Sequence, residues 1–285
     1  MEQLTIWAHR GASAYAPENT MEAFKLAVEQ HADGLDITIH RTKDGEIVVI
    51  HDDTIDRTSN GKGKVSNFTL AELKGFNFNA GFEDKYSQAE IPTLRQVLEF
   101  VKTHQLELNI EENVIFSDID LAATSLEAAK LVEEYGLSEQ VSFSSFNHHS
   151  MAQLKQSFPG IRTGILYLEG LYNGEAYAKT MGAAALHAFY VSVTPEMVKQ
   201  AHSAGIHVHA WTVNEAASIN SMIHAGVDVI ITDCPDMCFE LRSMDVEARH
   251  ALDEQQFRAK YGENRSYSFM QSLYTKMADN QSQKG

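Results

Sequence analysis

The chain alternates short apolar runs with amphipathic segments along most of its length, and this alternation limits the folds open to it more than any other feature. The apolar runs have the length and composition of strands and occupy residues 4–8, 34–40, 47–50, 106–110, 141–146, 163–168, 183–187, 207–212 and 227–231. The segments with helical spacing occupy residues 20–30, 93–104, 118–135, 148–157, 194–204 and 215–225. Strands that alternate with helices predict βα units and a mostly parallel sheet. At 285 residues, 44% of them hydrophobic, the chain has the size of a single α/β domain, a (β/α)8 TIM barrel.

One pair of predicted strands departs from the parallel pattern. Residues 34–41 alternate in polarity, with Asp36, Thr38 and His40 on one face. The turn at 42–45 has the sequence Thr-Lys-Asp-Gly, a hairpin signal that is far too short for a crossover helix. We therefore expect an antiparallel hairpin, with one of its strands outside an eight-stranded barrel. Asp36 and His51 lie at similar distances from this turn, so we expect them to approach each other across the ladder.

Two further segments fall outside the barrel pattern. Residues from about 53 to 90 interrupt the alternation and contain one helical stretch at 69–74, which predicts a small insertion. Beyond residue 240 the sequence is charged and helix-prone. We therefore expect a barrel over residues 1–240 and a helical tail over 241–285. This tail is expected to pack outside the barrel or against a second copy of the chain in a homo-oligomer.

Charge and hydropathy exclude several classes of partner. The formal net charge is −16, from 23 basic and 39 acidic residues, and argues against a nucleic acid or an anionic membrane as the main partner. No apolar run is long enough to span a membrane, and no signal-peptide pattern is present, so we expect a cytoplasmic protein. Cys234 and Cys238 are the only cysteines, and without a second pair they predict two reduced thiols.

Two histidines directly follow predicted strands. His9 follows the run Ile-Trp-Ala, and His51 follows Val-Val-Ile. A parallel barrel presents its catalytic groups at the carboxyl ends of its strands, and imidazole titrates near neutral pH. Arg10 adjoins His9 and offers a phosphate a fixed charge and a planar fork of donors. These residues predict an acid–base site with two histidines and a phosphate-binding arginine.

Several separated motifs resemble those of one known family. They are His-Arg-Gly at 9–11, Pro-Glu-Asn-Thr at 17–20, Thr-Lys-Asp-Gly at 42–45, Val-Val-Ile-His-Asp-Asp-Thr-x-Asp-Arg-Thr at 48–58, Asn-Ile-Glu at 109–111, Trp-Thr-Val-Asn at 211–214 and Ile-Ile-Thr-Asp at 230–233. Their order resembles the glycerophosphodiester phosphodiesterase family. The resemblance implies a TIM barrel that hydrolyses a small-molecule phosphodiester to glycerol 3-phosphate and an alcohol. It also implies that His9 and His51 are the catalytic acid and base, that Arg10 lies near the phosphate, and that Trp211 lines the substrate side.

The resemblance is incomplete at the positions that hold a divalent cation in the family. Family members usually carry Glu-x-Asp where this chain has Asp36-Ile-Thr38, and Glu-x-Lys where it has Glu111-Glu-Asn113. The implied ligands of a Mg²⁺ or Ca²⁺ ion are therefore Asp36, Glu111 and the neutral Thr38. Asn113 stands where the family lysine contacts the substrate phosphate. The altered positions predict a weakened or shifted metal site.

The sequence leaves alternatives open. Arg10 also suits an ion pair with Glu18, Asn19 or Thr20 suits a helix N-cap before Met21, and Trp211 suits the core. For the whole chain, the alternatives to hydrolysis are a non-catalytic relative that binds a phosphorylated ligand, and a phosphodiesterase or lyase with another substrate and little metal dependence.

Overall fold

Eight parallel strands close into a barrel in the computed structural model, which describes residues 4–79, 81–82, 85–112, 119–252, 257 and 260–261. The barrel strands are β1 (Thr5–His9), β2 (Gly34–Arg41), β4 (Glu107–Glu112), β5 (Val141–Ser145), β6 (Arg162–Tyr167), β7 (Ala185–Phe189), β8 (His207–Trp211) and β9 (Val229–Thr232). Strand β1 pairs with both β2 and β9, which closes the sheet on itself. The predicted (β/α)8 TIM barrel is confirmed.

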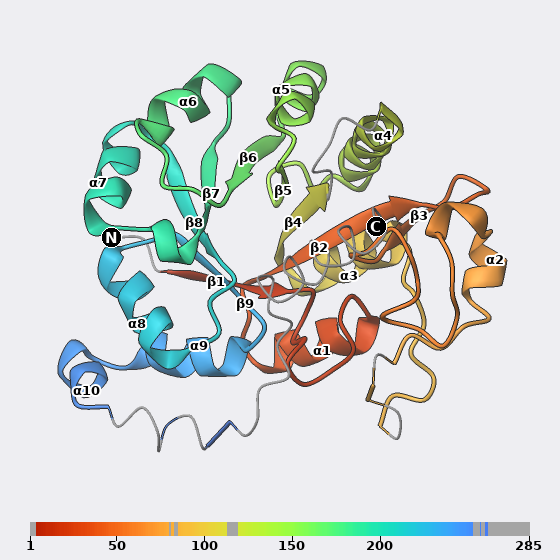
Figure 1. Cartoon of the computed structure of the whole chain (residues 1–285), viewed down its shortest axis with the longest axis horizontal. Helices are drawn as coiled ribbons and strands as arrows, with labels where there is room; N and C mark the ends of the chain where they lie inside the picture. Colours follow the sequence, from red (N-terminus) through yellow and green to blue (C-terminus); the bar gives the residue numbers. More distant parts are fainter. Residues whose placement is uncertain are drawn as a thin grey trace, which may run out of the picture.

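Helices surround the strands (Figure 1). They are α1 (Met21–Glu29), α3 (Leu94–His104), α4 (Ile119–Tyr135), α5 (His148–Ser157), α6 (Gly174–Met181), α7 (Pro195–Ser203), α8 (Ala216–Ala225) and α9 (Pro235–Ser243). Helix α6 was not predicted; it is short and is bounded by Asn173 and Gly182, both in left-handed conformation. Helix α9 crosses the boundary expected at residue 240 and packs against β1 and β9.

The predicted hairpin is confirmed. Strand β3 (Ile47–Val49) pairs antiparallel with β2, with Ile39 opposite Val49, and does not belong to the closed barrel. The chain that follows contains a 3-10 turn (Val65–Asn67) and the short helix α2 (Leu70–Leu73), which lie beside β3 at the right of Figure 1. This insertion has its own apolar core, formed by Val48, Ile50, Ile55, Val65, Leu73, Phe78 and Ile91.

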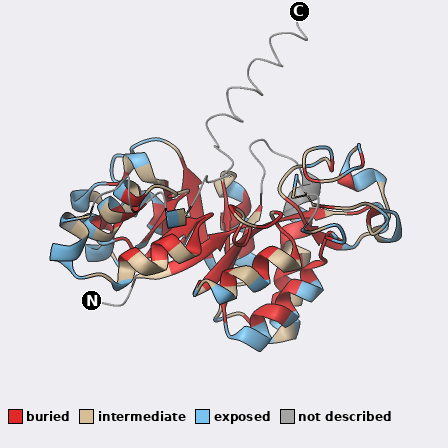
Figure 2. Cartoon of the chain, turned by 90° about the horizontal axis from the view of Figure 1, so that it is seen from below, coloured by how far each residue is buried: buried red, intermediate tan, exposed pale blue. Residues whose placement is uncertain are grey.

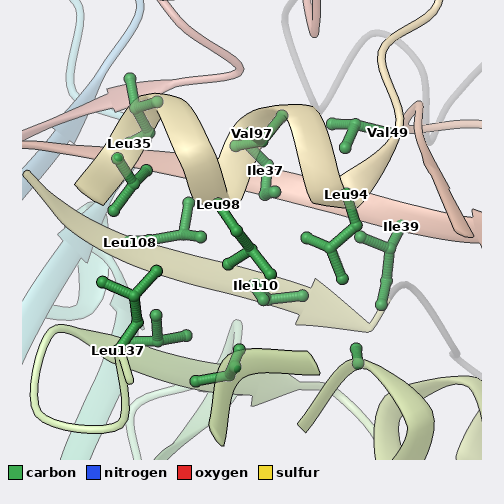
Figure 3. Packing of buried hydrophobic residues seen from close by; sticks show 14 of the residues in the cluster. Leu35, Ile37, Ile39, Val49, Leu94, Val97, Leu98, Leu108, Ile110 and Leu137 are labelled. Carbon is green, nitrogen blue, oxygen red and sulfur yellow. The ribbon is translucent and has the colours of Figure 1, made fainter. Parts of the chain in front are cut away.

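The main core lies between the barrel and the helices. Alternation along β2 points Leu35, Ile37 and Ile39 outward, where they meet α3 (Figure 3). Leu94 and Leu98 of α3 face these residues at the i, i+4 spacing of one helix face. Figure 2 shows the strands as the continuously buried layer and the helices as partly exposed around it. Full burial of each such side chain contributes about 1.5–3 kcal/mol.

The C-terminal segment is only partly described. Helix α10 (Val246–His250) follows α9, and Phe257 is buried in the same apolar cluster as α9. Cys234 and Cys238 are both free thiols and both buried, as predicted. In the described ranges, no helix combines the length and the apolar character that crossing a membrane would require.

Candidate active site

Neighbouring strands bring the predicted site residues to the carboxyl end of the barrel. His9, the last residue of β1, lies in register with Asp36 of β2. Farther along β2, Thr38 lies in register with Glu111 of β4. Alternation along these strands directs their side chains into the barrel, on the face opposite to the main core. The site therefore lies where a (β/α)8 barrel presents catalytic groups.

Asp233 orients His9. The Nδ1 atom of His9 lies 2.6 Å from Oδ1 of Asp233, and both side chains are buried. Asp233 also accepts hydrogen bonds from Ser13 Oγ and Asn214 Nδ2, at 3.0 and 2.7 Å. A carboxylate on Nδ1 places a proton there and leaves Nε2 to act on a substrate.

His51 is oriented by a carboxylate of its own. Its Nδ1 lies 2.8 Å from Oδ1 of Asp52, and Arg57 donates to the other oxygen of Asp52 at 2.8 Å. Burial and the nearby charge of Arg10 lower the pKa of His51 to about 3. His51 is therefore neutral throughout the neutral pH range. The acid that is hydrogen-bonded to His51 Nδ1 is Asp52, the next residue in the chain. The pairing of the two hairpin arms continues past Val49, since Ile50 N donates to Thr38 O at 3.0 Å, and the expected approach of Asp36 to His51 stays a prediction.

Arg10 lies between the two histidines. Its Nε donates to His9 Nε2 at 3.2 Å, and its charge acts on His51. Its Nη1 also donates to Glu18 at 2.9 Å, so the ion pair considered as an alternative to phosphate binding is present. Arg57 donates two further hydrogen bonds to Glu18, at 2.5 and 2.9 Å. Burial alone would raise the pKa of Glu18, but Arg10 and Arg57 hold that pKa well below its usual value.

The backbone at Arg10 and Gly11 has a special conformation. Both residues have positive φ, at 58° and 83°. A Cβ on Gly11 would lie 2.7 Å from the backbone carbon of Ala23, so only glycine fits against α1. This turn directs the Arg10 side chain toward His9, and a non-glycine residue with positive φ is the kind of strain that collects at functional sites.

Asn19 is not the N-cap of α1. The cap is Thr20, whose side chain accepts from Ala23 N. The Asn19 backbone N–H donates to Arg10 O at 2.9 Å, and its own φ is 55°. Among the described residues, neither Oδ1 nor Nδ2 of the buried Asn19 amide has a hydrogen-bond partner. A buried polar group of this kind is available to a ligand.

On the β2–β4 side, two carboxylates have no cationic hydrogen-bond partner among the residues that the structure describes. Asp36 accepts from Asn109 Nδ2 at 2.6 Å, and burial raises its pKa. Burial and the negative charge of Asp36 raise the pKa of Glu111 to about 7. Each carboxylate therefore makes the other costly to ionise, a cost that a bound cation would relieve.

The donor set suits a hard divalent cation in part. Within the described residues, no three or more histidine, cysteine, aspartate or glutamate side chains are grouped to hold a metal ion. Mg²⁺, however, is commonly bound through one or two carboxylates, with water and substrate phosphate completing its shell. Asp36 and Glu111 supply such a pair, and Thr38 lies in register with Glu111. Glu112 faces the helices instead, where it accepts from Ser125 and Ser150.

Of the two remaining predicted residues, Trp211 and Asn113, the structure describes only Trp211. Trp211 ends β8 and is 7% exposed, with its Nε1 donating to His187 O at 2.8 Å. Its ring lies edge-on to Phe146, with 5.7 Å between centroids. Asn113 lies outside the described residues.

Sequence reasoning missed several residues that support the site. Asp233, Asp52, Arg57 and Asn109 were not assigned, although all four lie within motifs quoted for the family resemblance. Those motifs were the available signal, since Asp233 lies 224 positions from His9 and no local pattern connects them.

These features define a barrel protein equipped for acid–base chemistry on an anionic substrate. Comparison with known proteins narrows this class. A sequence model described as the Glycerophosphoryl diester phosphodiesterase family matches residues 9–237. A Caldanaerobacter subterraneus protein named glycerophosphodiester phosphodiesterase is 42% identical over 242 residues, which cover 85% of this chain and 98% of that protein.

Solved structures agree in fold. An Oleispira antarctica phosphodiesterase, in complex with the product sn-glycerol-3-phosphate, has a TM-score of 0.77 at 26% identity, covering 85% of this chain and 98% of that one. A putative glycerophosphoryl diester phosphodiesterase from Silicibacter pomeroyi has a TM-score of 0.76 at 22% identity, covering 84% and 93%. This chain belongs to the glycerophosphoryl diester phosphodiesterase family. The family is generally dependent on a divalent metal.

Proposed function

We propose that this chain hydrolyses glycerophosphodiesters to glycerol 3-phosphate and an alcohol. The observation that carries the proposal is a pair of histidines, each held by its own carboxylate, with the buried Arg10 between them. Hydrolysis of a phosphodiester needs a base for the nucleophile, an acid for the departing alkoxide and positive charge for the phosphoryl oxygens. The named function of the relatives supports the same reaction.

The two histidines take different roles in this proposal. His51 is the proposed base, because its Nδ1 is held by Asp52 and its Nε2 is then the atom that accepts a proton. The lowered pKa of His51 keeps the ring unprotonated at neutral pH but also makes it a weaker base. His9 is the proposed acid that delivers a proton to the leaving alkoxide, because the contact of its Nδ1 with Asp233 orients the ring so that Nε2 is the working atom. Arg10 holds the phosphate, and its ion pair with Glu18 fixes the position of the guanidinium before substrate arrives.

The proposed metal site consists of Asp36 and Glu111, with the Thr38 hydroxyl beside them. A bound Mg²⁺ or Ca²⁺ ion supplies positive charge to the phosphoryl oxygens. The substitutions at 36, 38 and 113 weaken this assistance relative to other family members, so a slower enzyme is expected. Asn113, Asn19 and the aromatic wall at Trp211 are proposed to contact the glycerol or the alcohol group.

The direct test is release of glycerol 3-phosphate from glycerophosphocholine and glycerophosphoethanolamine, with Mg²⁺, Ca²⁺ or chelator. Replacing an acid–base group removes roughly 10²–10⁴-fold in rate, so His9→Ala and His51→Ala should each lose at least two orders of magnitude. His104→Ala is the matched control, because His104 is exposed at the end of α3.

The outcomes separate the alternatives. Turnover that requires His9, His51 and a divalent ion supports the proposal. Ligand binding without turnover, in protein with an unchanged melting temperature, would support a non-catalytic role. Turnover of another phosphodiester that survives chelation would support the alternative of a phosphodiesterase or lyase with another substrate and little metal dependence.

Three further proposals concern localisation, domain bounds and self-association. We propose a cytoplasmic protein whose barrel covers residues 1–240, with the insertion at about 53–90 and a helical tail at 241–285. Self-association through that tail is supported by its charged, helix-prone sequence and is tested by light scattering of the full chain against a truncation after residue 252.

A further inference from the structure

Arg57, in the insertion, binds carboxylates from two different parts of the proposed active site. Its Nε and Nη2 atoms donate to the two oxygens of Asp52, at 2.8 and 3.3 Å. Its Nη1 and Nη2 atoms donate to the two oxygens of Glu18, at 2.5 and 2.9 Å. All three nitrogens of the guanidinium therefore donate to carboxylates, in the bidentate geometry that arginine favours with such groups.

Each of these carboxylates also contacts one of the groups assigned to the reaction. Asp52 Oδ1 lies 2.8 Å from Nδ1 of His51, the proposed base. Glu18 Oε1 accepts from Nη1 of Arg10, the proposed phosphate ligand, at 2.9 Å. The side chains thus form one continuous series of contacts, in the order His51, Asp52, Arg57, Glu18 and Arg10.

The two ends of this series belong to different parts of the fold. Arg10 and Glu18 lie between α1 and β1, a barrel strand that is paired on both sides. His51 follows the three-residue strand β3, which lies outside the closed barrel. The contact of His40 Nε2 with His51 O, at 3.1 Å, holds the backbone there but not the imidazole. A link from the imidazole to the barrel segment runs through Arg57.

The acidic members of the series are largely shielded from solvent. The side chains of Glu18 and Asp52 are 10% and 16% exposed, against 30% for Arg57. Burial alone would raise the pKa of Asp52, but hydrogen bonds from His51 and Arg57 hold that pKa well below its usual value. Both acids are therefore charged at neutral pH and bind the guanidinium between them. Lysine would match the charge of Arg57 but not its planar fork, which meets two carboxylates at once.

We propose that Arg57 is a positioning residue for the reaction: by binding Asp52 and Glu18 together, it sets where the His51 imidazole lies relative to the Arg10 guanidinium. A phosphate held by Arg10 is then presented to the base in one orientation. Loss of orientation is costly, since a displacement of about 1 Å can reduce the rate roughly 10²-fold. Arg57 acts through its neighbours, because its nitrogens are engaged by carboxylates. This inference rests on the function proposed above.

The test is steady-state hydrolysis of glycerophosphocholine by the full chain, at a temperature well below the melting of every variant. In Arg57→Gln, which loses the charge and the fork, we expect kcat to fall roughly 10²-fold with little change in KM. Arg57→Lys keeps the charge but reaches one carboxylate at a time, so we expect a smaller loss, roughly tenfold. A residue that supports only folding would leave kcat per folded molecule unchanged.

A double-mutant cycle tests whether Arg57 acts through Asp52. If it does, Arg57→Gln/Asp52→Asn should lose about as much activity as the more damaging single variant, rather than the product of the two losses. Arg95→Gln is the matched control. It removes the same group from an exposed ion pair on α3, where Arg95 lies 4.0 Å from Glu134, and should leave kcat and KM unchanged.

The outcomes separate this inference from the proposed function. If the unmodified chain turns over substrate and depends on His9 and His51, an unchanged kcat in folded Arg57→Gln would overturn the role of Arg57 alone. A raised KM with an unchanged kcat would also overturn it, because Arg57 would then bind the substrate directly. Additive losses in the cycle would overturn the action through Asp52. No turnover by the unmodified chain would overturn both the function and the inference.

Discussion

The two sides of the catalytic end differ in whether their charged groups have partners of opposite charge within the chain. On the histidine side, each basic group already has an acidic partner, as in the contacts of His9 with Asp233 and of Arg57 with Glu18. On the β2–β4 side, Asp36 and Glu111 are close enough for their charges to oppose each other, and their pKa values are raised. The proposed proton-transfer groups are therefore held by contacts within the chain, whereas the carboxylate pair is the part of the proposed site that a cation would complete.

Breaking the histidine side should have the largest effect. Asp233→Asn keeps the shape of the side chain but removes the carboxylate that contacts His9 Nδ1, and so alters the proton position on the His9 ring. We expect kcat for glycerophosphocholine to fall on the order of 10³-fold with little change in melting temperature. Asp53→Asn is the control, since Asp53 is exposed and pairs only distantly with Lys64, at 3.6 Å. A loss smaller than about tenfold in folded Asp233→Asn would contradict the assigned role of Asp233.

Completing the carboxylate side should have the next largest effect. The combined variant Asp36→Glu, Thr38→Asp, Asn113→Lys restores the ligands and the cation usual in the family. We expect kcat/KM in Mg²⁺ to rise about 10²-fold, because a charge placed against the developing phosphoryl charge contributes a few kcal/mol. The control carries Asn113→Gln instead of lysine, which lengthens the side chain without the charge. No gain in a stably folded variant would show that the site is not a weakened family site.

The pH dependence of stability should also distinguish the carboxylate side from the histidine side, although its effect is expected to be smaller than those of the variants above. The pKa of Glu111 is raised from 4.5 to about 7 in the folded protein, so the folded state holds this proton more tightly than the unfolded chain. The stability it contributes is complete below about pH 4.5 and is lost as the pH rises through about 7. In chelator, the melting temperature of the unmodified chain relative to Glu111→Gln should therefore fall by about 6 °C from pH 4.5 to 8.

The control for this measurement is Glu99→Gln, an exposed position on α3. Its melting curve should run parallel to that of the unmodified chain across the same pH range. Added Mg²⁺ should recover the lost stability at high pH in the unmodified chain but not in Glu111→Gln. Parallel curves for Glu111→Gln as well would show that its carboxyl group is not under electrostatic stress.

The predictable part of this structure is the part encoded by local patterns. The hairpin of β2 and β3 followed from alternation and a four-residue turn, and the barrel followed from repeated βα units. The partners of His9 and His51 were not predictable in this way, because Asp233 reaches His9 only when β9 closes against β1. His207 and His209 remained unassigned because only the closed barrel places them beside His187.

The insertion core described above supports His51 but not His9. His9 is the end of a strand hydrogen-bonded on both sides, whereas His51 follows a three-residue edge strand supported by the small cluster around Ile55 and Val65. Amides in such a satellite unit exchange with solvent through local openings that leave the main barrel intact. Sequence changes in residues 53–90 should therefore alter the position of His51, the proposed base, without affecting closure of the barrel.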